Sequence, residues 1–336
     1  MKHNNIYKFK VLAVYSDHLV GARGYRVDLY SKDGKWMKHV GTLDDNIYAR
    51  LADFKLTRRL MRAEITALYD LADGAMLAIA KKGLFRKEKC ESVFRKVFSM
   101  PRGSKPLNIC FAKNGKAYFG EYFQNVEKKE VNVYASEDGC KTWHVIYSFD
   151  AGEINHVHGI FFDPYTDCIW ITTGDRENEC IIAWTNDDFK TLHEFVRGGQ
   201  EFRNCQLFFF EKSVVYATDS QYVENEIRRI DRKTSEITTL QRVQGSVIKG
   251  GQCGELAYFS TTVEPSEVNL DKYSHVWVSH GGQVWYDAYK IKKDNWPSIL
   301  QYATIEFPQH YAIDNRLYFS GRAVKKLDGK TTNIKL

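Results

Sequence analysis

The sequence predicts an all-β fold, a β-propeller of seven four-stranded blades. Strand-like segments recur in groups of four, and tight turns separate them at regular intervals. Residues 106–149, 156–196 and 203–243 repeat the same order most clearly. In the first of these units, the apolar segments PLNICFA, KAYFGEY, VNVYAS and WHVIYSF follow one another within about 43 residues, which is the spacing of a propeller blade.

Further units complete the predicted ring. The chain ends supply one unit each, and two looser units lie between the clear ones, at residues 7–41, 310–336, 64–98 and 255–291. Seven units in 336 residues average about 48 residues each, so we expect one domain over residues 1–336. Six blades is the alternative if both chain ends share a blade. Residues 46–60 are predicted to form one short helix.

Composition limits the class of protein. With 43% hydrophobic and 14% aromatic residues the chain can bury a core, which excludes a disordered protein. Its 48 Lys and Arg nearly balance 42 Asp and Glu without long basic runs, so nucleic acid is not an expected partner. The seven cysteines show no C-x-x-C spacing, and no segment resembles a signal peptide or a membrane span. We therefore expect a cytoplasmic protein with reduced thiols, whose oligomeric state is open.

One turn carries a recognisable motif. Residues 136–143, SEDGCKTW, follow the pattern S-x-D-x-G-x-T-W, with weaker copies at 31–36 and 185–191. The motif resembles the Asp box of BNR-repeat propellers, the sialidase-like superfamily, in which it lies between the third and fourth strands of a blade. Its Asp and Ser side chains would accept hydrogen bonds from turn N–H groups. Since sialidase-like enzymes pair a Tyr with a Glu, the resemblance also points to Tyr122 and Glu121.

The predicted topology places one group of loops on a single face of the ring. The loops from fourth strands to the next first strands, and from second to third strands, all open there. Candidate catalytic residues on this face are Glu121, Tyr122, His156, His158, Asp175, Asp219 and Glu264. Candidate substrate-binding residues are Arg23, Arg62, Arg203, Arg322, His310 and Tyr311.

The charges on this face are unevenly distributed. Arg322 and Arg23 fall on neighbouring blades, whereas Asp175, Asp219 and Glu264 fall on blades across the ring. A basic sector facing an acidic one suits a sugar that carries a carboxylate, because arginine binds carboxylates with two hydrogen bonds. The alternative is that these loop charges are solvated or paired with one another.

His156 and His158 are two residues apart on a predicted strand, so both side chains point to the same side. They could share a divalent metal ion. Alternatively, one histidine is hydrogen-bonded within the inner wall and the other contacts a ligand. Asp175 and Asp219 each end an apolar strand, and each could instead cap the turn that follows.

The first functional hypothesis is a carbohydrate-active enzyme, a sialidase-like glycoside hydrolase that acts on an acidic oligosaccharide or polysaccharide. Its substrate carboxylate would be held by Arg23, Arg203 and Arg322. Asp175 or Asp219 would protonate the leaving oxygen, and Glu121 with Tyr122 would supply the nucleophile or base. This chemistry requires no cofactor.

Two other classes of function remain open. In a uronate polysaccharide lyase, His156 or His158 and Tyr122 would act as base and acid, while Arg203 or a metal neutralises the uronate. In a non-catalytic glycan-binding or scaffold propeller, the same face would bind a partner without chemistry.

Overall fold

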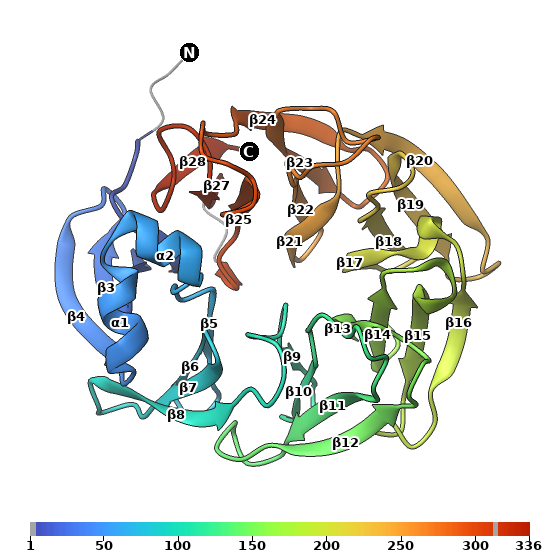
Figure 1. Ribbon diagram of the computed structural model, residues 1–336, viewed down its shortest axis with the longest axis horizontal. Coiled ribbons are helices and arrows are strands. Elements are labelled where there is room, and N and C mark those ends of the chain that lie inside the picture. Colours follow the sequence, from blue (N-terminus) through green and yellow to red (C-terminus); the bar gives the residue numbers. More distant parts are fainter. Residues whose placement is uncertain (1–4, 312–314) are drawn as a thin grey trace.

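The computed structural model describes residues 5–311 and 315–336. Its strands form a ring of sheets around a central axis, with one strand of each sheet beside the axis and one at the rim (Figure 1). The prediction of an all-β propeller-like fold is confirmed. Within the described residues the strands form six hydrogen-bonded sheets, so the count of seven blades stays a prediction, as does the single domain.

The first two groups of four strands are joined, and with β26 (His310–Tyr311) they form one sheet of nine strands. The first group is β1 (Lys10–Val14), β2 (His18–Arg23), β3 (Arg26–Ser31) and β4 (Trp36–Leu43). The second is β5 (Ala67–Asp70), β6 (Met76–Ala80), β7 (Gly83–Lys87) and β8 (Val93–Ser99). The rim strands β4 and β8 pair in parallel, with Thr42 opposite Val93 and Leu43 opposite Phe94.

Four regular sheets follow, each of four antiparallel strands in chain order. Their strands are β9 (Cys110–Phe111), β10 (Ala117–Gly120), β11 (Val131–Ser136), β12 (His144–Phe149); β13 (His156–Asp163), β14 (Cys168–Gly174), β15 (Ile181–Thr185), β16 (His193–Arg197); β17 (Asn204–Phe210), β18 (Ser213–Thr218), β19 (Asn225–Asp231), β20 (Ile237–Val243); and β21 (Val247–Cys253), β22 (Leu256–Thr261), β23 (Tyr273–His280), β24 (Tyr286–Lys292). Two short 3-10 helices, η1 (Glu177–Glu179) and η2 (Gln200–Phe202), precede β15 and β17.

The last sheet contains β25 (Thr304–Glu306), β27 (Arg316–Arg322) and β28 (Thr331–Lys335). Between them, β26 (His310–Tyr311) leaves this sheet and pairs in parallel with β1. The N-terminal segment binds back to the last sheet, because Tyr7 forms a bridge to Thr331 with N–H···O distances of 2.9 and 3.1 Å. Both ends of the chain therefore take part in closing the ring.

Apolar side chains fill the spaces between neighbouring sheets. Between the sheets of β17–β20 and β21–β24, the rings of Phe208 and Phe259 stack with centroids 6.3 Å apart. Trp285 lies 5.5 Å from the Phe208 ring and 5.0 Å from the Phe259 ring. Aromatic pairs of this kind add to the hydrophobic burial that holds adjacent sheets together. The inner strands are thereby fixed in position around the axis.

The turn between β11 and β12 has the hydrogen bonds that its side chains predict. Oδ1 of Asp138 accepts from the N–H groups of Lys141 and Thr142, both at 3.0 Å, and the Ser136 hydroxyl accepts from the Cys140 N–H at 3.0 Å. Gly139 supplies a φ of 73°. Burial alone would raise the pKa of Asp138, but these hydrogen bonds lower it to about 2.

The predicted helix at residues 46–60 is wrong in detail, because two helices replace it: α1 (Asn46–Ala52) and α2 (Lys55–Met61). Between them, Phe54 has an extended backbone with φ −104° and ψ 135°. The Thr57 hydroxyl donates to the Leu51 carbonyl at 2.6 Å, which satisfies one of the free carbonyls at the end of α1. In the part of the chain that the structure describes, no helix has the length and apolar character to cross a membrane.

Two predicted boundaries are also wrong. The unit expected at residues 255–291 begins earlier, with the polar, glycine-rich strand β21, whose sequence VIKGGQC lacks the apolar alternation used to find strands. In the last unit, which the sequence predicts as four strands over residues 310–336, the segment RAVKKLD at 322–328 does not form a strand beyond Arg322. Its later residues form turns, and Ala323 and Lys326 have φ values of 53° and 61°.

Removing a contact that closes the ring should lower the stability of the protein measurably. The Thr331 hydroxyl donates to the Phe9 carbonyl at 2.7 Å and accepts from the Val11 N–H at 2.9 Å. Replacing Thr331→Val removes the donor to the buried Phe9 carbonyl, while the Val11 N–H keeps its bond to the Ser320 hydroxyl at 3.0 Å, so we expect the free energy of unfolding to fall by about 1–3 kcal/mol. Urea unfolding should show this loss, whereas Thr238→Val on the rim strand β20 should change stability by less than about 0.5 kcal/mol. Equal losses in both variants would contradict the closure role.

Candidate functional site

Four elements bring polar side chains together at one end of the axis. His156 begins the inner strand β13, and Arg203 directly precedes the inner strand β17. Asp175 and Asp219 directly follow β14 and β18. Because β13 and β14, like β17 and β18, are antiparallel neighbours, the start of one strand lies beside the end of the next. The prediction that these residues share one face of the ring agrees with this arrangement.

The two histidines face each other. Nε2 of His156 lies 3.1 Å from Nε2 of His158. Nδ1 of His156 lies 2.9 Å from the Phe123 carbonyl oxygen, and Nδ1 of His158 lies 3.1 Å from the Asn204 carbonyl oxygen. A carbonyl can only accept, so both Nδ1 atoms carry hydrogen and both Nε2 atoms offer a lone pair in the neutral ring. Burial lowers the pKa of His158 to about 4, which favours that neutral ring.

A bulge and a glycine permit this approach. The register of β13 against β14 shifts between Val157 and Gly159, so His158 occupies a β-bulge. The His158 ring packs against Gly174, where a Cβ atom would lie 2.4 Å from Cε1 of the ring. Any other residue at position 174 would displace His158.

Asp175 connects the histidines with Arg203. Its Oδ1 lies 3.3 Å from Nε2 of His158, 3.5 Å from Nε2 of His156 and 2.9 Å from Nη2 of Arg203. Its Oδ2 accepts from the Asn155 side chain at 2.8 Å. The pKa of Asp175 lies below its usual range despite its burial, and the carboxylate is paired with the Arg203 guanidinium.

Asp219 is the second carboxyl group beside Arg203. Its Oδ2 lies 3.8 Å from Nη2 of Arg203, and the Cys205 thiol donates to it at 3.3 Å. Burial raises the pKa of Asp219 to about 7, against the opposing charge of Arg203. Near neutral pH, one carboxyl of this pair is therefore ionised and the other carries a proton for much of the time.

Tyr122 lies over the histidines, with its ring centroid 4.3 Å from that of His156 and 6.3 Å from that of His158. Burial raises the pKa of its phenol, and the nearby charges of Cys205 and Asp219 raise it further. The hydroxyl therefore stays protonated and can donate a hydrogen bond.

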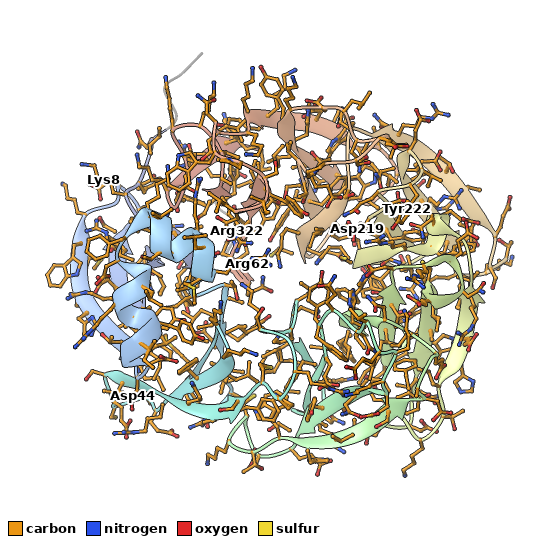
Figure 2. All side chains as sticks on the ribbon, viewed as in Figure 1. Lys8, Asp44, Arg62, Asp219, Tyr222 and Arg322 are labelled. Atoms are coloured by element: carbon orange, nitrogen blue, oxygen red, sulfur yellow. The ribbon has the colours of Figure 1, made fainter. Side chains whose placement is uncertain are left out.

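A second charged group, the axial charge cluster, lies across the axis. Lys10 on β1 is 2.5 Å from Glu306 on β25, and Arg322 on β27 is 2.6 Å from Glu64 and also contacts Glu306. Figure 2 shows Arg322 and Arg62 on the side of the central opening next to α2, with Asp219 on the opposite side. The predicted facing of basic and acidic sectors is consistent with this placement, but carboxylates of the chain already pair with Arg322.

Two lysines add positive charge near this cluster. In the described part of the chain, neither Lys105 nor Lys249 makes a side-chain hydrogen bond or ion pair. Burial and the charge of Arg322 lower the pKa of Lys105, and burial lowers that of Lys249. Both values are perturbed in the direction expected of lysines that lack an anionic partner.

Other predicted residues have partners within the protein. Glu121 is buried, accepts from Nε of Arg102 at 3.0 Å and from the Asn132 N–H at 2.9 Å. Glu264 is also buried and accepts from the Ser246 hydroxyl and, at 2.9 Å, from Gln221. Both carboxylates are therefore engaged in structural hydrogen bonds.

The remaining predicted residues lie apart from the histidines. Arg23 donates to the Lys8 carbonyl at 3.0 Å, and Tyr311 is buried in the hydrophobic core. Arg62 ends α2 with a left-handed φ of 51° and is exposed. The side chain of His310 lies outside the described part of the structure.

Sequence reasoning missed Lys10, Glu306, Cys205, Lys105 and Lys249. The first three lie inside inner strands next to apolar residues, so periodicity assigns them to the strand without marking them. A charged residue within the apolar segments FKVLAV and TIEF was the available signal, because buried charges in strands require partners.

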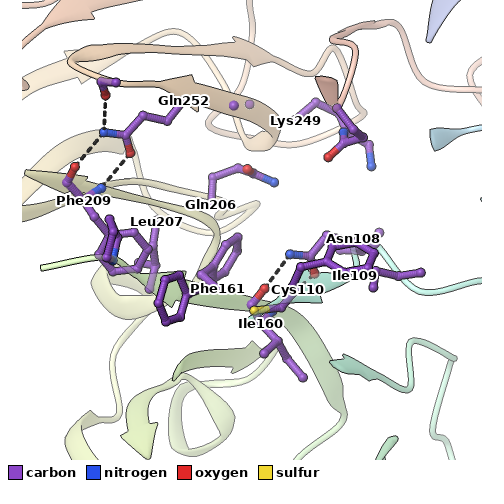
Figure 3. Close-up of a pocket in the computed structure, with 18 of the residues that line it drawn as sticks. Asn108, Ile109, Cys110, Ile160, Phe161, Gln206, Leu207, Phe209, Lys249 and Gln252 are labelled. Atoms are coloured by element: carbon purple, nitrogen blue, oxygen red, sulfur yellow. Dashed lines mark hydrogen bonds between the residues drawn. The ribbon is translucent and has the colours of Figure 1, made fainter. Parts of the chain in front are cut away.

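A cavity of about 410 Å³ lies toward the opposite end of the axis. Figure 3 shows its wall of side chains from β13, β17 and β21, including Phe161, Leu207, Phe209 and Lys249. Gln252 lies near the end of β21 here and donates to the Phe209 carbonyl at 2.6 Å.

Comparisons with known proteins identify the fold alone. No family model and no curated protein matches the chain. The WD40 β-propeller domain of Doa1 is similar with a TM-score of 0.56 at 13% identity, covering 97% of this chain and 93% of that one. A chain of the mitotic checkpoint complex gives 0.54 at 9% identity, covering 98% and 90%. A GH74 enzyme from Niastella koreensis gives 0.55 at 12% identity, covering 99% of this chain but 43% of that one. The chain is thus a β-propeller by structure.

The raised pKa of Asp219 predicts a pH-dependent stability. The folded protein keeps this proton up to about pH 7, whereas an unfolded aspartate loses it near pH 3.8. The contribution of Asp219 to the free energy of unfolding is therefore greatest below pH 3.8 and is lost as pH rises to about 7, by up to about 1.4 kcal/mol per pH unit. Urea unfolding across this range should show this decline in the wild type and a smaller one in Asp219→Asn. Parallel curves for the two proteins would contradict the raised pKa.

Proposed function

We propose that the protein is a carbohydrate-active enzyme, a glycoside hydrolase that acts on a sugar carrying a carboxylate. The observation that carries this proposal is the pair of carboxyl groups on either side of Nη2 of Arg203, one ionised and one with a pKa near 7. Carboxyl groups whose environments separate their pKa values are the usual means of acid catalysis at a glycosidic bond.

In this proposal Asp219 protonates the leaving oxygen. Arg203 sits between the two carboxyl groups and favours charge on Asp219 as the proton leaves. Asp175 stays ionised and positions the histidines and Arg203 around the reacting bond. The seven-blade ring and the sialidase-like turn motif belong to the same proposal, since both fit a propeller with its site at the axis.

Cationic side chains on the opposite side of the axis support the proposal that the substrate is acidic. Lys105 and Lys249 lack anionic partners within the described residues, and a bound carboxylate would restore their charged form. Arg62 is exposed on the same side as Arg322 (Figure 2). These cations, rather than Arg23 or Arg322, are the groups proposed to bind the substrate anion.

A second reaction, elimination at a uronate, is favoured by the position of Tyr122. Its ring lies over His156, and a phenol with a histidine can supply the acid and base of β-elimination. Hydrolysis adds one water to the total mass of the products, whereas elimination conserves the total mass and forms a conjugated double bond.

The test is incubation of the purified protein with neutral and acidic oligosaccharides, analysed by mass spectrometry. We expect cleavage of acidic chains with gain of one water. Asp219→Asn should reduce the rate about 10²- to 10⁴-fold, because it removes the proton donor. Asp287→Asn, which changes a carboxyl beside His275 on the sixth group of strands, should retain full activity.

Three other results would contradict the hydrolase. Products at conserved mass would establish the lyase, and binding without cleavage would establish a glycan-binding propeller. Cleavage at an unchanged rate by the Asp219→Asn variant would show that Asp219 is not the proton donor.

A further inference from the structure

Three atoms at the axial site converge on one point. Nε2 of His156, Nε2 of His158 and Oδ1 of Asp175 are 3.1, 3.3 and 3.5 Å apart pairwise. They form one of the groups of side chains whose donor atoms could hold a metal ion. Metal bonds of about 2.0–2.2 Å at angles between about 90° and 110° place neighbouring ligand atoms about 2.8–3.6 Å apart. The observed separations therefore match three ligands on one face of a single ion.

The hydrogen bonds behind these atoms have the pattern of a metal site. Each histidine donates its Nδ1 hydrogen to a backbone carbonyl, of Phe123 or Asn204, which fixes the ring and directs the Nε2 lone pair toward the axis. The other oxygen of Asp175 is held by the Asn155 side chain. Two lone pairs 3.1 Å apart repel each other unless a cation lies between them.

We propose that His156, His158 and Asp175 bind one divalent transition-metal ion, and that this ion holds an oxygen atom of the substrate sugar other than those of the carboxylate bound by Lys105 and Lys249. The second part rests on the proposed function, whereas the binding of the metal does not. Two imidazoles with one carboxylate suit Mn²⁺, Fe²⁺, Co²⁺ or Zn²⁺, whereas Mg²⁺ and Ca²⁺ prefer oxygen ligands alone.

The three metal ligands are not the groups that transfer protons in the proposed reaction. Three protein ligands leave coordination positions free for a small oxygen ligand. With Asp175 as a ligand, the proton transfers of the proposed reaction fall to Asp219 and Tyr122, neither of which is in this set. Arg203, 2.9 Å from Oδ1 of Asp175, is a positioning residue for the carboxylate.

A competing donor set shares one histidine. His158, Cys205 and Asp219 also bring their donor atoms within 4.8 Å of one another. The Cys205 thiol, however, donates a hydrogen bond to Asp219 at 3.3 Å. Nε2 of His158, the ring nitrogen that does not face the Asn204 carbonyl, lies 3.1 Å from Nε2 of His156 and 3.3 Å from Oδ1 of Asp175. The set that contains Asp175 is therefore the one we propose.

The test measures metal binding without any sugar. The full chain is stripped with a chelator, loaded separately with Mn²⁺, Co²⁺, Zn²⁺ or Mg²⁺, passed through gel filtration and analysed for metal content. We expect about one transition-metal ion per chain and no retained Mg²⁺. His158→Ala and Asp175→Asn should each weaken retention at least about tenfold. Their folding is checked by circular dichroism and thermal unfolding.

Two control variants make the assignment specific. His275→Ala removes another buried histidine flanked by two carboxylates, those of Asp271 and Asp287, and should retain the metal. Cys205→Ser should also retain it, and the Co²⁺ protein should lack a thiolate charge-transfer band.

The proposal is overturned if the stripped chain retains none of these transition metals, as it would if a proton alone lies between the histidines. Unchanged retention in a folded His158→Ala protein, or loss in Cys205→Ser, would also overturn it. A metal-loaded protein that cleaves no acidic glycan would contradict the proposed function while leaving the metal site in place.

Discussion

Closure of the ring is the constraint on which the rest of the structure depends. A propeller has no continuous core until its first and last sheets meet, and here Tyr7 pairs with Thr331 while β26 pairs with β1. The same contact brings Lys10 of the first strand to Glu306 near the end of the chain. The backbone hydrogen bonds that close the ring and the ion pairs beside the axis therefore form together, and the central site exists only in the closed ring.

The charges around the axis divide into two groups with different roles. In the axial charge cluster, Arg322 binds two carboxylates, so much of its charge is used to hold inner strands together. On the other side, Arg203 lies between carboxyl groups of unequal acidity. Desolvation makes ionic pairs costly unless their geometry is good, so stability and reactivity compete for the same few charges. Lys105 and Lys249, which form no ion pair with any residue that the structure describes, are the cations available to a ligand.

Local sequence predicts part of this molecule well. Repeated strands, tight turns and the spacing of His156 and His158 depend on neighbours in the chain, and the fold class and the facing histidines follow from them. Partners that are far apart in the sequence cannot be predicted from local patterns. The ion pair of Arg102 with Glu121 joins two different loops, and Lys249 looks like an ordinary residue of a weak strand. Tyr311 shows the same limit, since only the packed structure places it in the core. The sequence singled out Asp175 and Asp219, whose role in a site stays a prediction, and missed the inner-strand lysines.

The parallel pairing of β4 with β8 affects how the molecule resists aggregation. A rim strand normally presents free N–H and C=O groups on which another chain can add a strand. Here the two rim strands cover part of each other's edges, with the Thr42 N–H bonded to the Ser92 carbonyl and the Asp44 N–H to the Phe94 carbonyl, both at 2.9 Å. The groups β1–β4 and β5–β8 are thus joined along their rim strands. Local opening of one group exposes the rim strand of the other. Amide hydrogens of both groups would exchange with solvent as one cooperative unit.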